Sequence, residues 1–174
     1  MRRLASLLVL LLLAPVAAGH AAEPPAVAWP EPAPVLPPAL APEEVARAVE
    51  IIDGDTLVLD DGRQVRLVGI QAPKLPLGRA GFQAWPLAEE AKAALAELTL
   101  GRELRLAYGG RRMDRHGRVL AHVQTADGLW VQGMLLGAGL ARVYSFADNR
   151  TAVDRMLALE ARARAAGRGI WALD

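Results

Sequence analysis

The stretch from Ile51 to Leu59 reads I-I-D-G-D-T-L-V-L, and V-R-L-V-G-I-Q-A-P-K follows it from Val65 to Lys74. Asp-Gly pairs stand at positions 53–54 and 61–62, and runs rich in β-branched and aliphatic residues flank both pairs. An Asp-Gly pair between two such runs is a strong short-range signal for a hairpin turn. Together with the alternation that starts at Val45, the stretch predicts a three-stranded antiparallel meander.

Beyond the meander, the pattern changes to a helical one. Pro86 opens a segment with Glu89 and Glu90 in its first turn and with apolar residues on one face, and Gly101 closes it. Strands are expected at Glu103 to Tyr108 and at Arg118 to Thr125, followed by a short helix from Val131 to Ala138 that ends at Gly139.

A last helix is expected to start at Thr151, whose hydroxyl would cap it with Asp154 at the third position, and to end at Gly167 or Gly169. The order is then three strands, a helix, two strands and two helices. It predicts an α+β fold that is mainly β, namely a five-stranded OB-fold (oligonucleotide-binding) barrel with three added helices.

The N-terminus has the order of a secretory signal. Arg2 and Arg3 precede an apolar run from Leu7 to Leu13, and small residues follow from Ala17 to Ala22. The alternative is a membrane anchor, but the run is shorter than the about 20 residues that cross a bilayer. We therefore expect residues 1–21 to be a signal peptide, cleaved after Ala18 or Ala21. The protein would be exported, periplasmic or secreted, with no stable membrane insertion after cleavage.

Residues 22–44 are rich in proline and lack either hydrophobic period, which predicts a polyproline-like linker before a single domain at residues 45–174. Recognition of this segment as a PxxP ligand is the alternative interpretation. The chain has 174 residues and no cysteine, so packing alone must stabilise it after export. Loss of Arg2 and Arg3 leaves 18 basic and 19 acidic residues, a net charge of −1. Affinity for polyanions must then be local.

The motifs of the chain resemble those of the thermonuclease family, also called staphylococcal-nuclease-like (SNase-like) domains, from about Val45 to Trp171. Each motif alone is weak, and D-G-D-T alone is also a plain hairpin turn; the resemblance rests on their order and spacing. The motifs are D-G-D-T at 53–56, V-R-L at 65–67, an Ala-Pro turn at 72–73, D-x-x-G-R at 114–118, G-L-A at 139–141 with Tyr144 after it, and G-I-W at 169–171.

The resemblance implies a phosphodiester-cleaving site. In the family, Ca²⁺ held by oxygen ligands polarises the phosphodiester, a glutamate activates water, and two arginines stabilise the charge on the phosphoryl oxygens. By position, Asp55 would be a metal carboxylate supported by Asp53. Arg66 and Arg118 would be the phosphate-binding catalytic arginines.

The family's next acidic pair, in the motif D-x-P-E, reads Q-A-P-K here. Gln71 replaces a metal ligand, and Lys74 replaces the water-activating glutamate, which changes the charge of the site by three units. A unit charge pair about 4 Å apart is worth about 4 kcal/mol at an effective dielectric near 20. Ca²⁺ is the cofactor that the resemblance implies, but we expect its binding to be weak or lost. A protonated Lys74 also cannot act as the base.

The remaining charges predict an anion-binding pocket. The expected phosphate ligands are Arg66, Arg118 and Lys74. A basic loop beside them, at residues 109–118, contains Arg115. The alternative for that loop is a solvated charged hairpin. Tyr144 and Phe146 would stack on bases, or else belong to the core or its rim. The expected partner is a nucleic acid or another phosphate-bearing ligand, and the sequence identifies no protein partner.

Other kinds of site are not supported. His116 and His122 lack the cysteine partners and spacing of a zinc site, and the chain has no P-loop, dinucleotide-binding fingerprint or serine nucleophile motif. Two classes of function remain. One is a degenerate nuclease without Ca²⁺-dependent hydrolysis that keeps an anion-binding or nucleic-acid-binding pocket. The other is an active thermonuclease-type endonuclease with altered metal use; a protein-interaction module is a further alternative.

Overall fold

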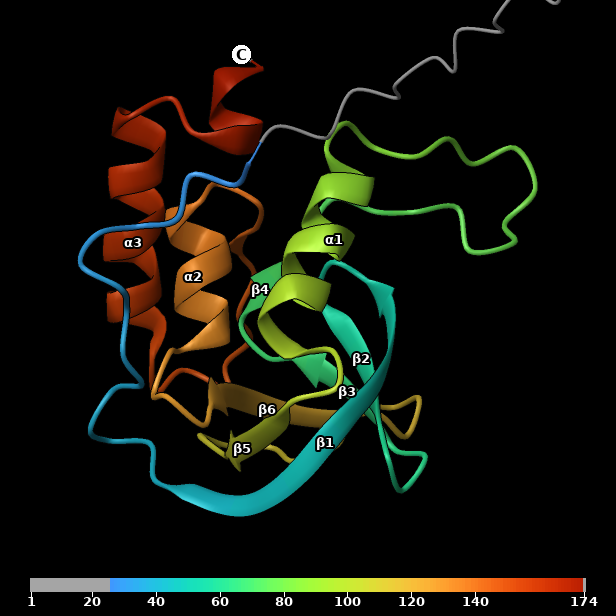
Figure 1. Cartoon of the computed structure of the whole chain (residues 1–174), viewed down its shortest axis with the longest axis vertical. Coiled ribbons are helices and arrows are strands. Elements are labelled where there is room, and N and C mark those ends of the chain that lie inside the picture. The colour runs from blue at the N-terminus through green and yellow to red at the C-terminus, as the bar shows by residue number, and fades with distance from the viewer. Residues whose placement is uncertain (1–25, 174) are drawn as a thin grey trace, which may run out of the picture.

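The computed structural model describes residues 26–173, so the expected signal peptide lies outside the described residues. Five strands form a closed barrel with the neighbour order β1, β2, β3, β6, β5 (Figure 1). Their bounds are β1 Pro42–Asp53, β2 Thr56–Leu59, β3 Gln64–Leu67, β5 Glu103–Ala107 and β6 Val119–Thr125. The first three strands form the predicted antiparallel meander, and a parallel pairing of β3 with β6 closes the barrel. The prediction of an α+β OB-fold barrel is confirmed.

Three helices cover the barrel, as predicted. The bounds are α1 Ala88–Thr99, α2 Val131–Gly137 and α3 Val153–Ala165, with a final 3₁₀ turn, η1, at Gly169–Ala172. In Figure 1, α1 stands over the barrel, while α2 and α3 lie side by side next to it. Strand β4 (Ile70–Gln71) pairs with β7 (Arg142–Val143) outside the barrel. One hydrophobic cluster joins the barrel interior to the inner faces of the helices.

Two predicted helix starts were wrong. α1 begins at Ala88, two residues after Pro86, because Leu87 has a left-handed backbone with a φ of 62°. α3 begins at Val153, and the predicted Thr151 cap does not form. The Thr151 hydroxyl instead donates to the Gly109 carbonyl oxygen at 2.6 Å, which joins the start of α3 to the segment after β5. Tertiary contact overrides the local capping pattern here.

Gly54 brings the turn between β1 and β2 into close contact with α1. A Cβ atom at this position would lie 2.7 Å from the Cβ atoms of both Ala72 and Ala91. Real Cβ atoms do not approach that closely, so only glycine fits without displacement. The close approach holds the Asp53 and Asp55 side of the turn against the segment that follows β4.

The described part of the predicted Pro-rich linker, residues 26–44, packs against the domain. Leu36 and Leu40 are buried in the core, and the backbone N–H of Trp130 donates to the Pro34 carbonyl oxygen at 2.9 Å. A Cβ atom on Gly133 or Gly137 of α2 would lie within 2.7 Å of proline ring atoms of this segment. The segment therefore packs on α2, and Figure 1 shows it crossing in front of the helices. Its apolar residues lack periodicity because the segment is irregular, and only a regular helix or strand places its buried residues at a fixed spacing.

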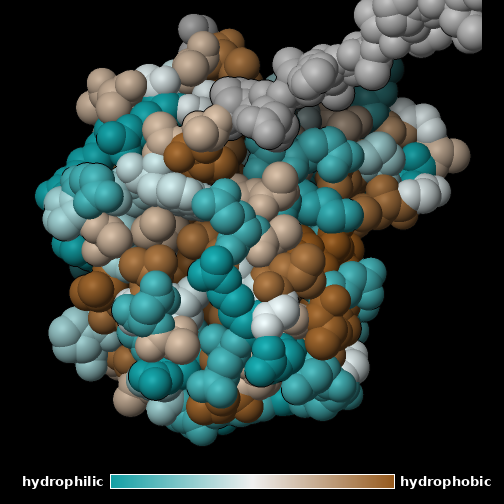
Figure 2. All heavy atoms as spheres, viewed as in Figure 1, coloured by the Kyte–Doolittle hydropathy of each residue, from teal (hydrophilic) through white to brown (hydrophobic). Residues whose placement is uncertain are grey.

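Within residues 26–173, no helix combines the length and apolar character that crossing a membrane requires. Figure 2 shows hydrophilic and hydrophobic residues mixed over the face seen in Figure 1. Among the exposed large hydrophobic residues are Val49, Leu100 and Leu157, which lie on different elements. Scattered exposed apolar residues of this kind are normal for a globular domain.

Candidate phosphate-binding cleft

Two carboxylates at the turn between β1 and β2 form the base of the site. Asp55 is fully buried, and its Oδ2 atom accepts a hydrogen bond from the backbone N–H of Ala72 at 2.8 Å. Its Oδ1 atom accepts from the Thr56 hydroxyl at 3.2 Å. Asp53 accepts from the backbone N–H of Asp55 at 3.1 Å. Because both oxygens of Asp55 act as acceptors, the contacts are those of an ionised carboxylate.

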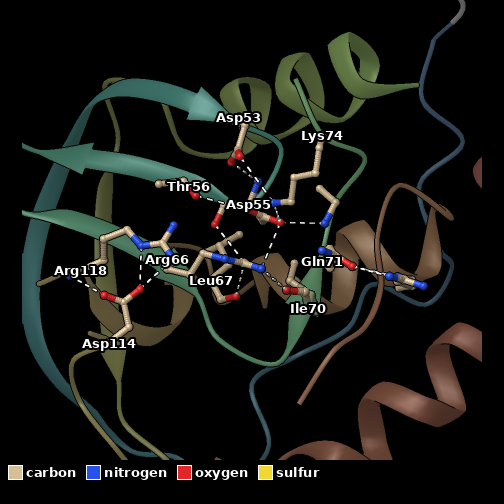
Figure 3. Close-up of polar contacts among 12 residues, drawn as sticks. Asp53, Asp55, Thr56, Arg66, Leu67, Ile70, Gln71, Lys74, Asp114 and Arg118 are labelled. Carbon is tan, nitrogen blue, oxygen red and sulfur yellow. Dashed lines mark hydrogen bonds and ion pairs between the residues drawn. The ribbon is translucent and has the colours of Figure 1, made fainter. Parts of the chain in front are cut away.

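Lys74 lies between these carboxylates (Figure 3). Its Nζ atom is 2.7 Å from Oδ2 and 3.0 Å from Oδ1 of Asp55, and 3.5 Å from Oδ2 of Asp53. Its side chain is only 19% exposed. The sequence predicted that Lys74 would contribute positive charge to the site. The structure adds that this charge is directly paired with both remaining metal-type carboxylates.

Arg66, on β3, also reaches the buried carboxylate. Its Nη2 atom is 3.2 Å from Oδ2 of Asp55 and donates to the Ile70 carbonyl oxygen at 2.6 Å. Its Nη1 atom donates to the Leu67 carbonyl oxygen at 2.9 Å. With a side chain 12% exposed, Arg66 has a large part of its hydrogen-bonding capacity used inside the protein.

The pKa values of the two carboxylates are shifted in opposite directions. Burial is the largest influence on Asp55 and raises its pKa, although the charges of Arg66 and Lys74 oppose this shift. Burial also acts on Asp53, but the Lys74 charge and hydrogen bonds from Asp55 and Thr56 outweigh it and lower the pKa of Asp53. The single cation Lys74 therefore pairs with both carboxylates. These contacts offset the cost of burying two negative charges.

The residues present do not fit Ca²⁺. That ion takes six to eight oxygen ligands at about 2.3–2.6 Å, and an ammonium group stands where the two carboxylates converge. In the part of the chain that the structure describes, no group of three or more histidine, cysteine or acidic residues could hold a metal ion.

Gln71, at the position of a family metal ligand, turns away from the carboxylates. Its Oε1 atom accepts from Nε and Nη2 of Arg142 on β7, at 3.0 and 2.5 Å. Figure 3 places Gln71 on the far side of Arg66 from Arg118. Gln71 therefore links β4 to β7 in this structure, which the sequence did not predict.

Arg118, the residue just before β6, is held by Asp114. Its Nε and Nη2 atoms are both 2.7 Å from Oδ2 of Asp114. Burial opposes ionisation of Asp114, but hydrogen bonds from Arg118 and His116 outweigh it and lower the pKa of Asp114. The contact orients the guanidinium of Arg118, whose side chain is 30% exposed. The structure pairs Arg111 with Asp148 and Arg112 with Glu43.

A cleft of about 910 Å³ brings the predicted site residues together. Those that line it are Asp53, Arg66, Gln71, Lys74, Arg115, Arg118 and Tyr144; Asp55 lies beneath it, in contact with Lys74 and Arg66. Sequence reasoning did not assign Arg79, Arg111 and His116, which also line the cleft. Arg111 and His116 stand in the basic loop that the sequence singled out, whereas Arg79 has no motif around it. Roles for all of these residues in binding or catalysis stay predictions.

Tyr144 and Phe146 lie at the rim of the cleft. They are 45% and 61% exposed, and their rings form an edge-to-face pair with centroids 5.1 Å apart. The structure therefore favours the rim over the core for both aromatics. His122, in contrast, is buried beside Trp130, and this burial lowers the pKa of His122 to about 4.

The sequence of this chain is similar to those of known proteins. The family model for staphylococcal nuclease homologues matches residues 64–173. A thermonuclease of Staphylococcus hyicus is 28% identical over 132 residues, which cover 74% of this chain and 76% of that protein. A protein described as an uncharacterized endonuclease of Escherichia coli is 30% identical over 137 residues, 77% of this chain and 81% of that protein.

The closed five-stranded barrel with three helices is the fold expected of an SNase-like domain. The chain belongs to the staphylococcal nuclease family. This family generally uses Ca²⁺, and membership implies nucleic-acid binding.

Proposed function

We propose that the protein is a degenerate nuclease that has lost Ca²⁺-dependent phosphodiester hydrolysis and binds nucleic acid or another phosphate-bearing ligand without a metal. The observation that carries the proposal is the Lys74 Nζ atom, 2.7 Å from Asp55 and 3.5 Å from Asp53. Lys74 neutralises the carboxylates that a metal would need. A side chain thus supplies the positive charge at this point of the cleft.

The cleft also has little capacity for general-base catalysis. Its three lining carboxylates, Asp53, Asp114 and Asp148, are each paired with a cation of the same cleft. Lys74, at the position of the family's glutamate, donates to both carboxylate oxygens of Asp55. A base must accept a proton from water within hydrogen-bond reach, and these groups are already engaged.

The balance of charge favours an anionic ligand. Six basic residues line the cleft against three acidic ones, and the buried Asp55 adds one further negative charge. The basic residues are Arg66, Lys74, Arg79, Arg111, Arg115 and Arg118. Guanidinium groups bind phosphate oxygens in a bidentate manner and stay charged at any relevant pH. Arg115 and Arg118 are the better phosphate partners, since Arg66 is largely engaged by carbonyl oxygens.

Titration with a single-stranded oligonucleotide and with a nucleoside bisphosphate will test this proposal. We expect binding that is weak, weakened further by salt and unchanged by EDTA. Arg118→Ala or Arg115→Ala will weaken it by about tenfold each, because a charge-assisted hydrogen bond is lost. Arg105→Ala, exposed on β5 outside the cleft, is the matched control and will bind like the wild type. Arg66→Ala is a less clean variant, because Arg66 also supports Asp55.

Absence of binding at low salt, or unaltered binding by the cleft variants, would remove the nucleic-acid proposal and favour a protein-interaction module. The second candidate is an endonuclease with altered metal use. It is favoured by the relatives, since those aligned over three quarters of this chain are described as a thermonuclease and an endonuclease. Hydrolysis that depends on a metal other than Ca²⁺ would establish it.

Export is part of the proposal. It rests on Arg2-Arg3, the apolar run at positions 7–13 and the small residues after it, all of which precede the described residues. Protein from its native host will lack its first 18 or 21 residues by mass spectrometry. An intact Met1 on a cytosolic species would contradict both cleavage and export.

A further inference from the structure

A second cleft, of about 520 Å³, lies next to the phosphate-binding cleft. Its walls are apolar and aromatic, with Trp85 and Pro86 from the segment before α1 and Ile170 and Trp171 from η1. Arg142 and Arg164 also line it. Neither the family motifs nor the site described above assigns this cleft a ligand.

The two clefts adjoin at β4 and at the segment after it. Gln71 lines both of them. In addition, the backbone N–H of Trp85 donates to the Lys74 carbonyl oxygen at 2.9 Å, which closes the base of the loop between these residues. Lys74 lines the first cleft and Trp85 the second, so this backbone hydrogen bond joins a residue of one cleft to a residue of the other. Figure 1 shows this loop, before α1, projecting from the body of the protein.

The chemistry of the second cleft matches a nucleotide chain. Trp85 is 42% exposed and offers a surface for stacking. The carboxylate among the lining residues, Glu160, is engaged by Arg164 at 3.0 Å and by the backbone N–H of Val143, so it adds little repulsion. Arg142 is exposed and contacts the neutral Gln71 amide, so its positive charge can serve a phosphate.

We propose that one single strand of nucleic acid occupies both clefts, with a phosphate beside Arg115 and Arg118 and another base of the same strand on Trp85. This inference rests on the proposed function and extends it from a phosphate site to a site for several nucleotides. Aromatic side chains and a cationic groove together are the means by which proteins bind single strands without reading sequence. A duplex is the poorer ligand, because its bases are stacked on each other and cannot reach Trp85.

The test measures how affinity depends on ligand length, by fluorescence anisotropy in EDTA at low salt. The ligands are a deoxythymidine dinucleotide, an oligothymidylate of about 12 nucleotides, within the usual range of site sizes, and a duplex of the same length. Wild-type protein will bind the long single strand at least about tenfold more tightly than the dinucleotide or the duplex. Trp85→Ala will remove about tenfold of the affinity for the long strand, as expected for one stacked base, and Trp85→Phe will restore most of it.

Leu100→Ala is the control for loss of exposed apolar surface, because Leu100 is 48% exposed and lines neither cleft. It will bind both single strands like the wild type. If the dinucleotide binds but length adds nothing, or if Trp85→Ala binds the long strand as well as the wild type, this inference is wrong and the proposed function stands. If no single strand binds at low salt, this inference is wrong, and so is the nucleic-acid part of the proposed function.

Discussion

Addition of Ca²⁺ to the purified protein will leave its cleavage of DNA and RNA at background. A general base contributes about 10²–10⁴-fold to such a reaction, and the position of the family's base is occupied by the ion-paired Lys74. Cleavage of a labelled single-stranded substrate, with Ca²⁺ or EDTA added, measures the effect. The thermonuclease of Staphylococcus hyicus serves as positive control. Strong Ca²⁺-stimulated cleavage that Asp55→Ala abolishes would contradict the degenerate-nuclease proposal.

Restoring the family's acidic residues will recover Ca²⁺ binding. In Lys74→Glu combined with Gln71→Asp, the ammonium between Asp53 and Asp55 is replaced by carboxylates, which changes the charge of the site by three units. We expect the variant to be stabilised by Ca²⁺, seen as a rise in Tm that depends on Ca²⁺ concentration. Gln71→Asp alone will gain little Ca²⁺ binding, because Lys74 remains and Arg142 will pair with the new carboxylate. An unchanged Tm in the double variant would show that other features of the scaffold exclude the ion.

Lys74→Met will strongly destabilise the protein, by about 3 kcal/mol. Removal of one member of a buried ion pair leaves the other charge buried, and such losses amount to about 3–5 kcal/mol. The lower figure is expected because Arg66 still contacts Asp55. For a protein of this size, we expect a fall in Tm of roughly 10 °C. Urea unfolding monitored by circular dichroism measures the free energy of unfolding.

Two further variants test the cause of this loss of stability. Lys74→Met combined with Asp55→Asn will recover part of the stability, because the unpaired charge is removed together with its partner. Arg111→Met, which breaks an exposed ion pair of 3.8 Å with Asp148, will cost less than about 1 kcal/mol. If Lys74→Met costs no more than Arg111→Met, Lys74 does not compensate the buried carboxylate.

Much of the barrel could be predicted from the sequence because its signals are local. The Asp-Gly turns define the meander, and the glycine at position 101 closes α1. The start of α3 was wrong because the partner of Thr151 is Gly109, 42 residues earlier. The packing of Leu36 and Leu40 was missed for a similar reason, since prolines removed any period that would mark them as core. Local patterns do not report contacts between distant segments.

The site shows the same difference between local signals and contacts of distant segments. Motifs indicated which residues would gather around Asp55, and the cleft contains them. The sequence could not show that Lys74 lies within hydrogen-bond distance of both Asp55 oxygens, because this depends on the path of the chain after β4. Nor could it show that Gln71 turns to Arg142, 71 residues later. The second cleft could not be predicted, because its walls come from five separate segments, and the motifs at 72–73 and 169–171 do not show that these segments meet.

Strand β1 has a consequence for synthesis of the chain. Its first half, at residues 42–47, pairs with β5, while its second half pairs with β2. The second half finds its partner within a few residues, but the first must wait until residues 103–107 have emerged from the ribosome. Until then it is an unpaired edge, the kind of surface on which nascent chains associate wrongly. The charged residues Glu43, Glu44 and Arg47 on this half discourage such association during the delay.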